Sequence, residues 1–125
     1  MHSELVTKYN VPGPRYTSYP TVPYWNNNSF SLKGWKNTLR KSYLESKEEG
    51  ISLYIHLPFC ESMCTFCGCT KRITRNHDVE IPYIKSLIKE WQLYLDLLGE
   101  KPIVKELHIG GGTPTFFSAQ NLQLL

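Results

Sequence analysis

The sequence has 125 residues, of which 41% are hydrophobic and 20% are charged, and its formal net charge at pH 7 is +3. This length and apolar content suit one globular domain with a modest core and exclude a disordered chain. The basic residues are scattered rather than gathered in a block, so no nucleic acid and no membrane is indicated as a partner, while a small anionic ligand is compatible with the charge.

The first 30 residues are predicted to form an extended N-terminal arm. Helix-breaking residues are frequent there and are followed by three asparagines, a composition that does not sustain a helix. They are Pro12, Gly13, Pro14, Pro20 and Pro23. Residues 31–50 are predicted to form an amphipathic helix, because apolar and basic residues alternate there at helical spacing and Gly50 can end it.

Residues 51–57 alternate as in a β-strand, with Tyr54 and His56 on one face, and Pro58 stops the strand. A long loop with all four cysteines follows. The next helix is predicted to begin between Asp78 and Pro82 and to end at Gly99. Its apolar stripe consists of Ile84, Leu87, Ile88, Trp91, Leu95 and Leu98.

Residues 103–109 form a second predicted strand, which ends in a glycine turn at 110–114, and Ser118 is the expected N-cap of a helix still running at Leu125. This order of strands and helices predicts an α/β fold with a parallel sheet. A complete barrel of such units needs roughly 200 residues or more. We therefore expect residues 51–125 to be the first βαβα units of a partial (β/α) barrel, truncated in this chain.

All four cysteines lie within ten residues, whereas a disulfide framework would spread them. Cys60, Cys64 and Cys67 have the spacing C-x₃-C-x₂-C on a loop, so three thiolates can converge on one iron–sulfur cluster and leave one iron open. With Cys69 they could instead form a tetrahedral zinc site, although structural zinc ligands usually come as two separated pairs. The absence of a secretory signal favours a cytoplasmic protein.

The segment from Tyr54 to Cys67, with Phe66 before the third cysteine, resembles the signature of the radical S-adenosylmethionine superfamily. The resemblance implies a [4Fe–4S] cluster on Cys60, Cys64 and Cys67, whose open iron is chelated by S-adenosylmethionine. It also implies cofactor contacts for Tyr54 and Phe66, although ordinary core packing of aromatic residues is the alternative. In this superfamily the reduced cluster cleaves the sulfonium to a 5′-deoxyadenosyl radical.

The glycine turn is not a phosphate loop, because neither G-x₄-G-K-[ST] nor G-x-G-x-x-G is present. Glycines there permit positive φ and close approach of the backbone to a ligand, although a simple tight turn is equally compatible. Since the turn and the cysteine loop both follow the carboxyl ends of parallel strands, we expect them to share one cavity. The turn also resembles the second motif of the superfamily, which implies cofactor contacts for Gly111, Gly112 and Thr113.

Two further features, the arm from Pro12 to Thr21 and the additional Cys69, resemble the family of oxygen-independent coproporphyrinogen III oxidases. The resemblance implies oxidative decarboxylation of two propionates of coproporphyrinogen III to vinyl groups, which gives protoporphyrinogen IX for haem synthesis. It also implies two molecules of S-adenosylmethionine, an electron donor and an electron acceptor of unknown identity, and a thiol at Cys69 near the substrate as a catalytic candidate.

A substrate with four carboxylates requires cations, and Arg15, Arg72 and Arg75 are the candidates. His56 and His108 share strand faces with Tyr54 and Glu106 and could point into the barrel, although hydrogen-bonded packing histidines are commoner. Within the superfamily the alternative is a haem-binding chaperone, and outside it a non-enzymatic zinc module. We expect the remaining substrate and cofactor contacts to lie beyond Leu125, so that the chain alone does not turn over.

Overall fold

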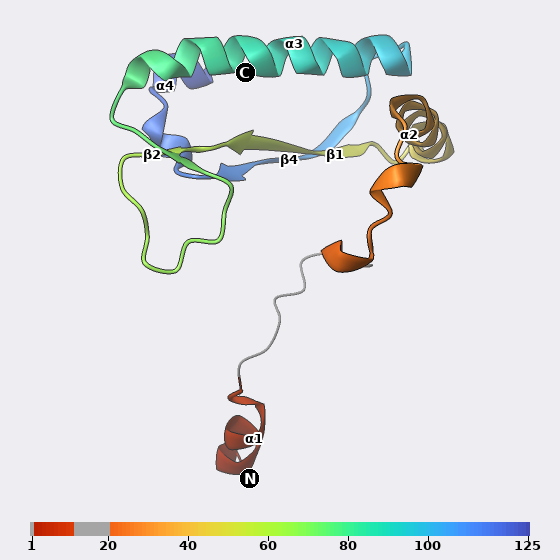
Figure 1. Ribbon diagram of the computed structural model, residues 1–125. Coiled ribbons are helices and arrows are strands. Elements are labelled where there is room, and N and C mark those ends of the chain that lie inside the picture. The colour runs from red at the N-terminus through yellow and green to blue at the C-terminus, as the bar shows by residue number, and fades with distance from the viewer. Residues whose placement is uncertain (1, 12–20) are drawn as a thin grey trace. The chain divides into compact units, whose positions relative to one another are not determined.

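The computed structural model describes residues 2–11 and 21–125 and divides into two units, Met1–Leu32 and Lys33–Leu125 (Figure 1). The first unit contains helix α1 (His2–Tyr9) and two 3₁₀ turns, Val22–Tyr24 and Asn27–Ser29. The extended arm expected over residues 1–30 is therefore wrong for residues 2–9. The prolines begin only at residue 12, and Glu4 in the first turn and Lys8 in the last turn complement the helix dipole.

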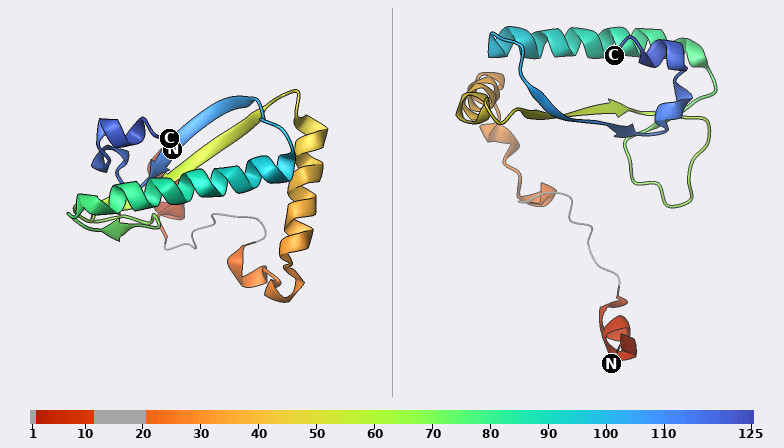
Figure 2. Two further views of the ribbon diagram at one scale, coloured as in Figure 1. Left: turned by 90° about the horizontal axis from the view of Figure 1, so that it is seen from above. Right: turned by 180° about the vertical axis from the view of Figure 1, so that it is seen from behind.

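The second unit contains two two-stranded parallel sheets, β1–β4 and β2–β3, together with helices. Its elements are α2 (Leu32–Ser46), β1 (Ile51–Leu57), β2 (Phe59–Cys60), β3 (Arg72–Ile73), α3 (Glu80–Leu98), β4 (Val104–Gly111) and α4 (Ala119–Leu122). Short 3₁₀ turns at His77–Val79 and Pro114–Phe116 lead into α3 and towards α4. Helix α3 lies along one face of the β1–β4 pair (Figure 2). No helix among the described residues combines the length and the apolar content needed to cross a bilayer.

The predicted parallel pairing is confirmed. Strands β1 and β4 are hydrogen-bonded neighbours, with Ser52 opposite Glu106, Tyr54 opposite His108 and Leu57 opposite Gly111. Because both strands run the same way, the segments that follow them leave from the same edge of the sheet. The cysteine loop follows β1, and the glycine turn follows β4. The predicted strand end at residue 109 is wrong by two residues, because Gly110 and Gly111 still pair with His56 and Leu57 in the sheet and the turn proper begins at Gly112.

The boundaries of α3 agree with the predicted signals. The helix begins at Glu80, Pro82 lies in its first turn, and Gly99 ends it in the left-handed conformation with φ +79. Ser118 caps α4 by accepting a hydrogen bond from the Asn121 N–H. The helix expected to continue at Leu125 ends at Leu122, because the last residues tighten into i→i+3 hydrogen bonds.

The core lies at the carboxyl end of the strands. Leu57, at the end of β1, and Ile84, in α3, are fully buried. They pack with Phe59, Phe116 and Phe117, which come from the segments directly after the two strands. Burial of these side chains therefore fixes the starting points of the cysteine loop and the glycine turn. Each fully buried apolar side chain stabilises the fold by about 1.5–3 kcal/mol.

Candidate functional site

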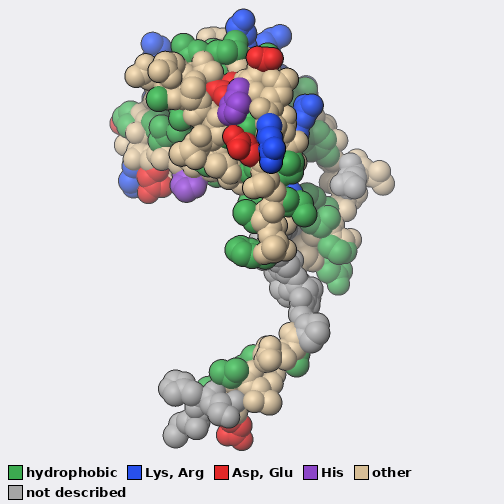
Figure 3. All heavy atoms as spheres, turned by 90° about the vertical axis from the view of Figure 1, so that its left-hand side faces the viewer, with side chains coloured by type: hydrophobic (Ala, Val, Ile, Leu, Met, Phe, Trp, Pro, Cys, Tyr) green, Lys and Arg blue, Asp and Glu red, His purple; other side chains and the backbone are tan. Residues whose placement is uncertain are grey.

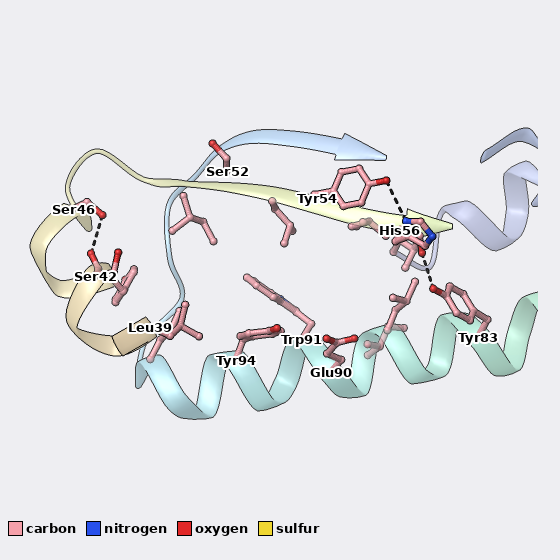
Figure 4. A pocket seen from close by; sticks show the side chains of 18 residues that line it. Leu39, Ser42, Ser46, Ser52, Tyr54, His56, Tyr83, Glu90, Trp91 and Tyr94 are labelled. Atoms are coloured by element: carbon pink, nitrogen blue, oxygen red, sulfur yellow. Dashed lines mark hydrogen bonds between the residues drawn. The ribbon is translucent and has the colours of Figure 1, made fainter. Parts of the chain in front are cut away.

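The side of the sheet opposite α3 is polar. Tyr54 stacks on His108 of the neighbouring strand, with ring centroids 5.5 Å apart and planes 12° apart. Ser52 donates a hydrogen bond of 2.8 Å to the Glu106 carboxylate on the same face. Figure 4 shows Ser52 and Tyr54 on the side of β1 away from α3. The alternation predicted for this strand is thus present, and the polar face is open for a ligand or for further protein.

His56 connects this face to the end of the cysteine loop. Its Nε2 lies 2.9 Å from the Thr70 carbonyl oxygen, and its Nδ1 lies 3.2 Å from the Tyr54 hydroxyl. Because a carbonyl oxygen only accepts, Nε2 donates to the Thr70 carbonyl oxygen, while Nδ1 lies within hydrogen-bond distance of the Tyr54 hydroxyl. His56 therefore holds the end of the cysteine loop by hydrogen bonds. This agrees with the hydrogen-bonded packing role that the sequence analysis gave as the commoner alternative.

The base of the cysteine loop is closed by a second pair of strands. β2 and β3 pair in parallel, with Phe59 opposite Arg72 and Cys60 opposite Ile73. The Thr74 N–H donates to the Cys60 carbonyl oxygen at 2.9 Å, and the Arg72 N–H donates to that of Pro58 at 2.8 Å. The loop between these strands extends away from α3 (Figure 1). Its two ends are fixed, while its middle is solvent-exposed.

The thiols differ in exposure. Cys60 is 9% exposed, Cys67 is partly buried, Cys64 and Cys69 are exposed, and all four are free thiols. The Cys67 N–H donates to the Cys64 carbonyl oxygen at 3.3 Å, so these two cysteines share one turn. Across the described ranges, no three side chains of His, Cys, Asp or Glu are close enough together to hold a metal ion. Coordination by Cys60, Cys64 and Cys67 stays a prediction.

The glycine turn contacts the first of these cysteines. The Gly112 N–H donates to the Leu57 carbonyl oxygen at 2.7 Å, and the Thr113 N–H donates to that of Phe59 at 3.0 Å. The Thr113 hydroxyl lies 3.3 Å from the Cys60 sulfur, to which it donates. A Cβ on Gly112 would lie only 2.8 Å from the same sulfur. The two predicted motifs are therefore in direct contact at Cys60.

The other two glycines leave room for side chains of β1. Gly111 has φ +109, and a Cβ there would lie 2.7 Å from the His56 ring. A Cβ on Gly110 would lie 3.0 Å from the Tyr54 ring and hydroxyl. Gly111 is thus favoured by its positive φ and by close packing against His56, and a side chain on Gly110 would crowd Tyr54.

The remaining predicted residues are not gathered at this contact. Phe66 is 90% exposed on the cysteine loop. Arg72 and Arg75 are exposed and make none of the ion pairs found among the described residues. Arg15 lies outside the described residues. The arrangement leaves both described arginines free to bind an anion, but it does not assemble a substrate site.

A buried acid that the sequence analysis missed lies next to both motifs. Glu80 is 2% exposed, and its carboxylate accepts hydrogen bonds from His77 Nδ1 at 2.7 Å, the Ser118 N–H at 3.0 Å and Asn121 Nδ2 at 2.6 Å. Burial raises the pKa of the Glu80 carboxyl, but the hydrogen bonds from Asn121, Ser118 and His77 outweigh it and lower the pKa below its ordinary value. The carboxylate is therefore ionised at neutral pH.

His77 extends this network towards the cysteine loop. Its Nε2 lies 3.5 Å from the carboxylate of Glu61, the residue after Cys60, and its ring stacks on Phe116 with centroids 4.4 Å apart. The hydrogen bond to Glu80 is the largest cause that raises the pKa of His77. Figure 3 views the molecule from the end where α3 begins and shows histidine and acidic side chains together on this surface.

A cavity of about 510 Å³ lies between β1, α2 and α3, and Tyr54 and His56 are among the residues that line it. Figure 4 shows Trp91 and Tyr94 of α3 facing β1 across it. Its lining is mostly apolar and contains none of the cysteines or the residues of the glycine turn. The cavity therefore adjoins the candidate site at Tyr54 and His56 but does not reach the contact of Cys60 with the glycine turn.

A cysteine loop after one parallel strand, in contact with a glycine turn after its neighbour, is typical of radical S-adenosylmethionine enzymes. A solved structure described as coproporphyrinogen III oxidase (HemN) from Escherichia coli, a radical SAM enzyme, matches with a TM-score of 0.69 and 31% identity. The match covers 96% of this chain and 25% of that chain. No family model matches.

Curated relatives agree with the structural match. An oxygen-independent coproporphyrinogen III oxidase from Mannheimia haemolytica is 40% identical over 97% of this chain and 82% of the relative. The enzyme of that name from Pseudomonas aeruginosa is 37% identical over 98% of this chain but only 26% of the relative. The chain belongs to the oxygen-independent coproporphyrinogen III oxidase family and spans about a quarter of the length of the Pseudomonas relative.

Proposed function

We propose that this chain forms the cluster-binding part of a radical S-adenosylmethionine oxidoreductase, coproporphyrinogen dehydrogenase, acting in haem biosynthesis. The observation that carries the proposal is the direct contact of Cys60 with Gly112 and Thr113. Residues 51–125 are then the first units of a partial (β/α) barrel, preceded by helix α2, which occupies Leu32–Ser46 of the predicted 31–50, and by the segment 1–30. Four free thiols suit a reducing compartment such as the cytoplasm.

The donor set fits an iron–sulfur cluster. Cys60, Cys64 and Cys67 are free thiols on a loop whose two ends are fixed by strand pairing, and three thiolates are the ligands that such a cluster needs when one iron stays open. A hydroxyl that donates to a ligating sulfur, as that of Thr113 does to Cys60, is an outer-shell contact that orients the ligand. Cys69 is left over, and we assign it to the substrate side.

The same edge of the sheet suits S-adenosylmethionine. In this proposal Gly111, Gly112 and Thr113 present backbone groups to the cofactor, and Tyr54 and Phe66 present aromatic faces to it. When bound, the cluster and the cofactor supply a one-electron cleavage that yields a 5′-deoxyadenosyl radical. The contribution of the chain is to orient the cofactor against the open polar face and to exclude water.

The substrate chemistry follows from this assignment. Each propionate of coproporphyrinogen III loses one hydrogen atom from its β-carbon to the radical, then carbon dioxide, and finally one electron to a one-electron acceptor, which leaves a vinyl group. Two such cycles give protoporphyrinogen IX, and two bound molecules of S-adenosylmethionine would serve them. Arg15, Arg72 and Arg75 are the cations that we propose for the substrate carboxylates.

Electron paramagnetic resonance tests the proposal. The chain is reconstituted anaerobically with iron and sulfide, reduced with dithionite, and measured with and without S-adenosylmethionine. We expect a [4Fe–4S]⁺ signal that changes when the cofactor is added, because the cofactor occupies the open iron. A colourless protein that binds zinc, or a signal indifferent to the cofactor, would overturn the proposal.

A further inference from the structure

Glu80 is an ionised carboxylate in an almost completely buried position, and such a group is costly unless every lone pair is used. Here one oxygen accepts from His77, and the other accepts from Ser118 and Asn121. We call Glu80, His77, Ser118 and Asn121 the Glu80 network. No buried side-chain polar atom in the described part of the chain lacks a partner, so the network is fully satisfied.

The members of this network come from segments that are far apart in the sequence. Glu80 and His77 follow the cysteine loop, whereas Ser118 and Asn121 follow the glycine turn, 38 and 41 positions beyond Glu80. His77 also stacks on Phe116, next to the glycine turn. On its other side it faces Glu61, which adjoins Cys60. The network therefore joins the segments that continue from both motifs.

We propose that Glu80 and His77 are positioning residues that hold the cysteine loop against the segment after the glycine turn and so keep Cys60 in contact with Gly112 and Thr113. This inference rests on the proposed function, because the position of Cys60 matters for activity only if Cys60 binds the cluster. A favourable interaction with the dipole of α3 does not by itself explain why Glu80 is buried, because an exposed acid in the first turn of α3 would interact with the dipole equally well. The lowered pKa of Glu80 agrees with an ion held in a fixed set of donors.

The test measures the protection of the Cys60 thiol in the chain before any cluster is added. Cys60 is 9% exposed while Cys64 is exposed, so the rates at which the two thiols are alkylated, resolved by mass spectrometry, have an internal reference. For Glu80→Ala we expect the Cys60 rate to rise about tenfold relative to Cys64, the factor for a loss of about 1.4 kcal/mol of local stability. For Glu80→Gln we expect near wild-type protection, because a Gln amide can donate to His77 Nδ1 while its oxygen still accepts from Ser118.

Tyr43→Ala is the matched control. Tyr43 is 6% exposed, and its hydroxyl donates to Glu100, ahead of β4 and at the opposite end of the sheet from Cys60. This change destabilises the unit without touching the Glu80 network, so Cys60 should stay protected at equal fractions folded. Equal deprotection by Tyr43→Ala and Glu80→Ala, or continued protection in Glu80→Ala, would overturn the inference. A Glu80→Gln chain as reactive as Glu80→Ala would overturn the hydrogen-bonded network in favour of a pure charge effect.

If Glu80→Ala does not fold, His77→Phe is measured by the same criteria, because it keeps a ring on Phe116 and removes both polar contacts. After reconstitution we expect the Glu80→Ala chain to keep its iron content and to lose about tenfold in affinity for S-adenosylmethionine. Failure of the wild-type chain to bind the cofactor would refute the proposed function, whereas the alkylation rates would still decide the role of Glu80.

Discussion

Replacing Gly112 with alanine tests the closest contact between the two motifs. The added Cβ would lie 2.8 Å from the Cys60 sulfur, 2.8 Å from the Phe59 carbonyl oxygen and 2.9 Å from the Pro58 carbonyl carbon. Ordinary contacts begin at 3.4 Å, so the neighbours must retreat by about 0.6 Å, the difference between 3.4 and 2.8 Å. Two of the three neighbours are backbone atoms and cannot rotate away. Overpacking of this kind costs about 1–3 kcal/mol of unfolding free energy.

The assay is thermal unfolding followed by circular dichroism. A loss of 1 kcal/mol lowers the melting temperature by about 4–8 °C in a domain of this size. Gly34→Ala is the control, since Gly34 is exposed inside α2 and alanine there favours the helix by about 0.5–1 kcal/mol. If the Gly112→Ala chain has the melting temperature of the wild-type chain and its Cys60 thiol is equally protected from alkylation, the close approach of Gly112 to Cys60 is refuted.

Two further predictions concern the cysteines and pH. Replacing any one cysteine of the C-x₃-C-x₂-C triad with serine should abolish the brown colour and the bound iron after reconstitution, whereas Cys69→Ser should retain both; loss of iron in Cys69→Ser would favour the zinc-type Cys₄ arrangement. Because the pKa of Glu80 is lowered in the folded state, ionised Glu80 stabilises the fold at pH values above the ordinary pKa of a Glu carboxyl, and this stabilisation is lost as the pH falls through the pKa of Glu80 in the folded chain. Because the pKa of His77 is raised, protonated His77 stabilises the fold at pH values below the ordinary pKa of a histidine, and this stabilisation is lost as the pH rises through the pKa of His77 in the folded chain. The urea concentration at the midpoint of unfolding should therefore be highest at pH values between the folded-state pKa values of Glu80 and His77. In the Glu80→Gln chain the urea midpoint should fall less as the pH is lowered.

The elements that the sequence predicts well are those whose signals are local. Alternation predicts β1, the apolar stripe predicts α3, and Gly99 predicts the left-handed end of that helix. The parallel pairing follows from the order of elements and is also confirmed. These signals depend on a few neighbouring residues, so no tertiary contact is needed to interpret them.

The features that the sequence analysis missed depend on distant contacts or on too broad a use of composition. Glu80 has the appearance of an ordinary acid at the start of a helix, and only Ser118 and Asn121 show that it is buried. The helix α1 cannot be inferred from the composition of the whole arm, because the prolines begin only at residue 12 and a helix can form before them. A hydrogen-bonding role for His56 could be proposed from the strand face, but its partner Thr70 is known only from the fold.

The correspondence between the two motifs gives each of the three consecutive glycines a close neighbour. Gly110 lies against Tyr54, Gly111 against His56 and Gly112 against Cys60, so each glycine leaves space for one side chain of the first motif. Because β1 and β4 are parallel and in fixed register, a shift of one residue would remove all three fits together. The glycine turn thus fixes the position of Cys60. The open polar face is therefore pre-organised by packing and does not depend on a bound ligand for its shape.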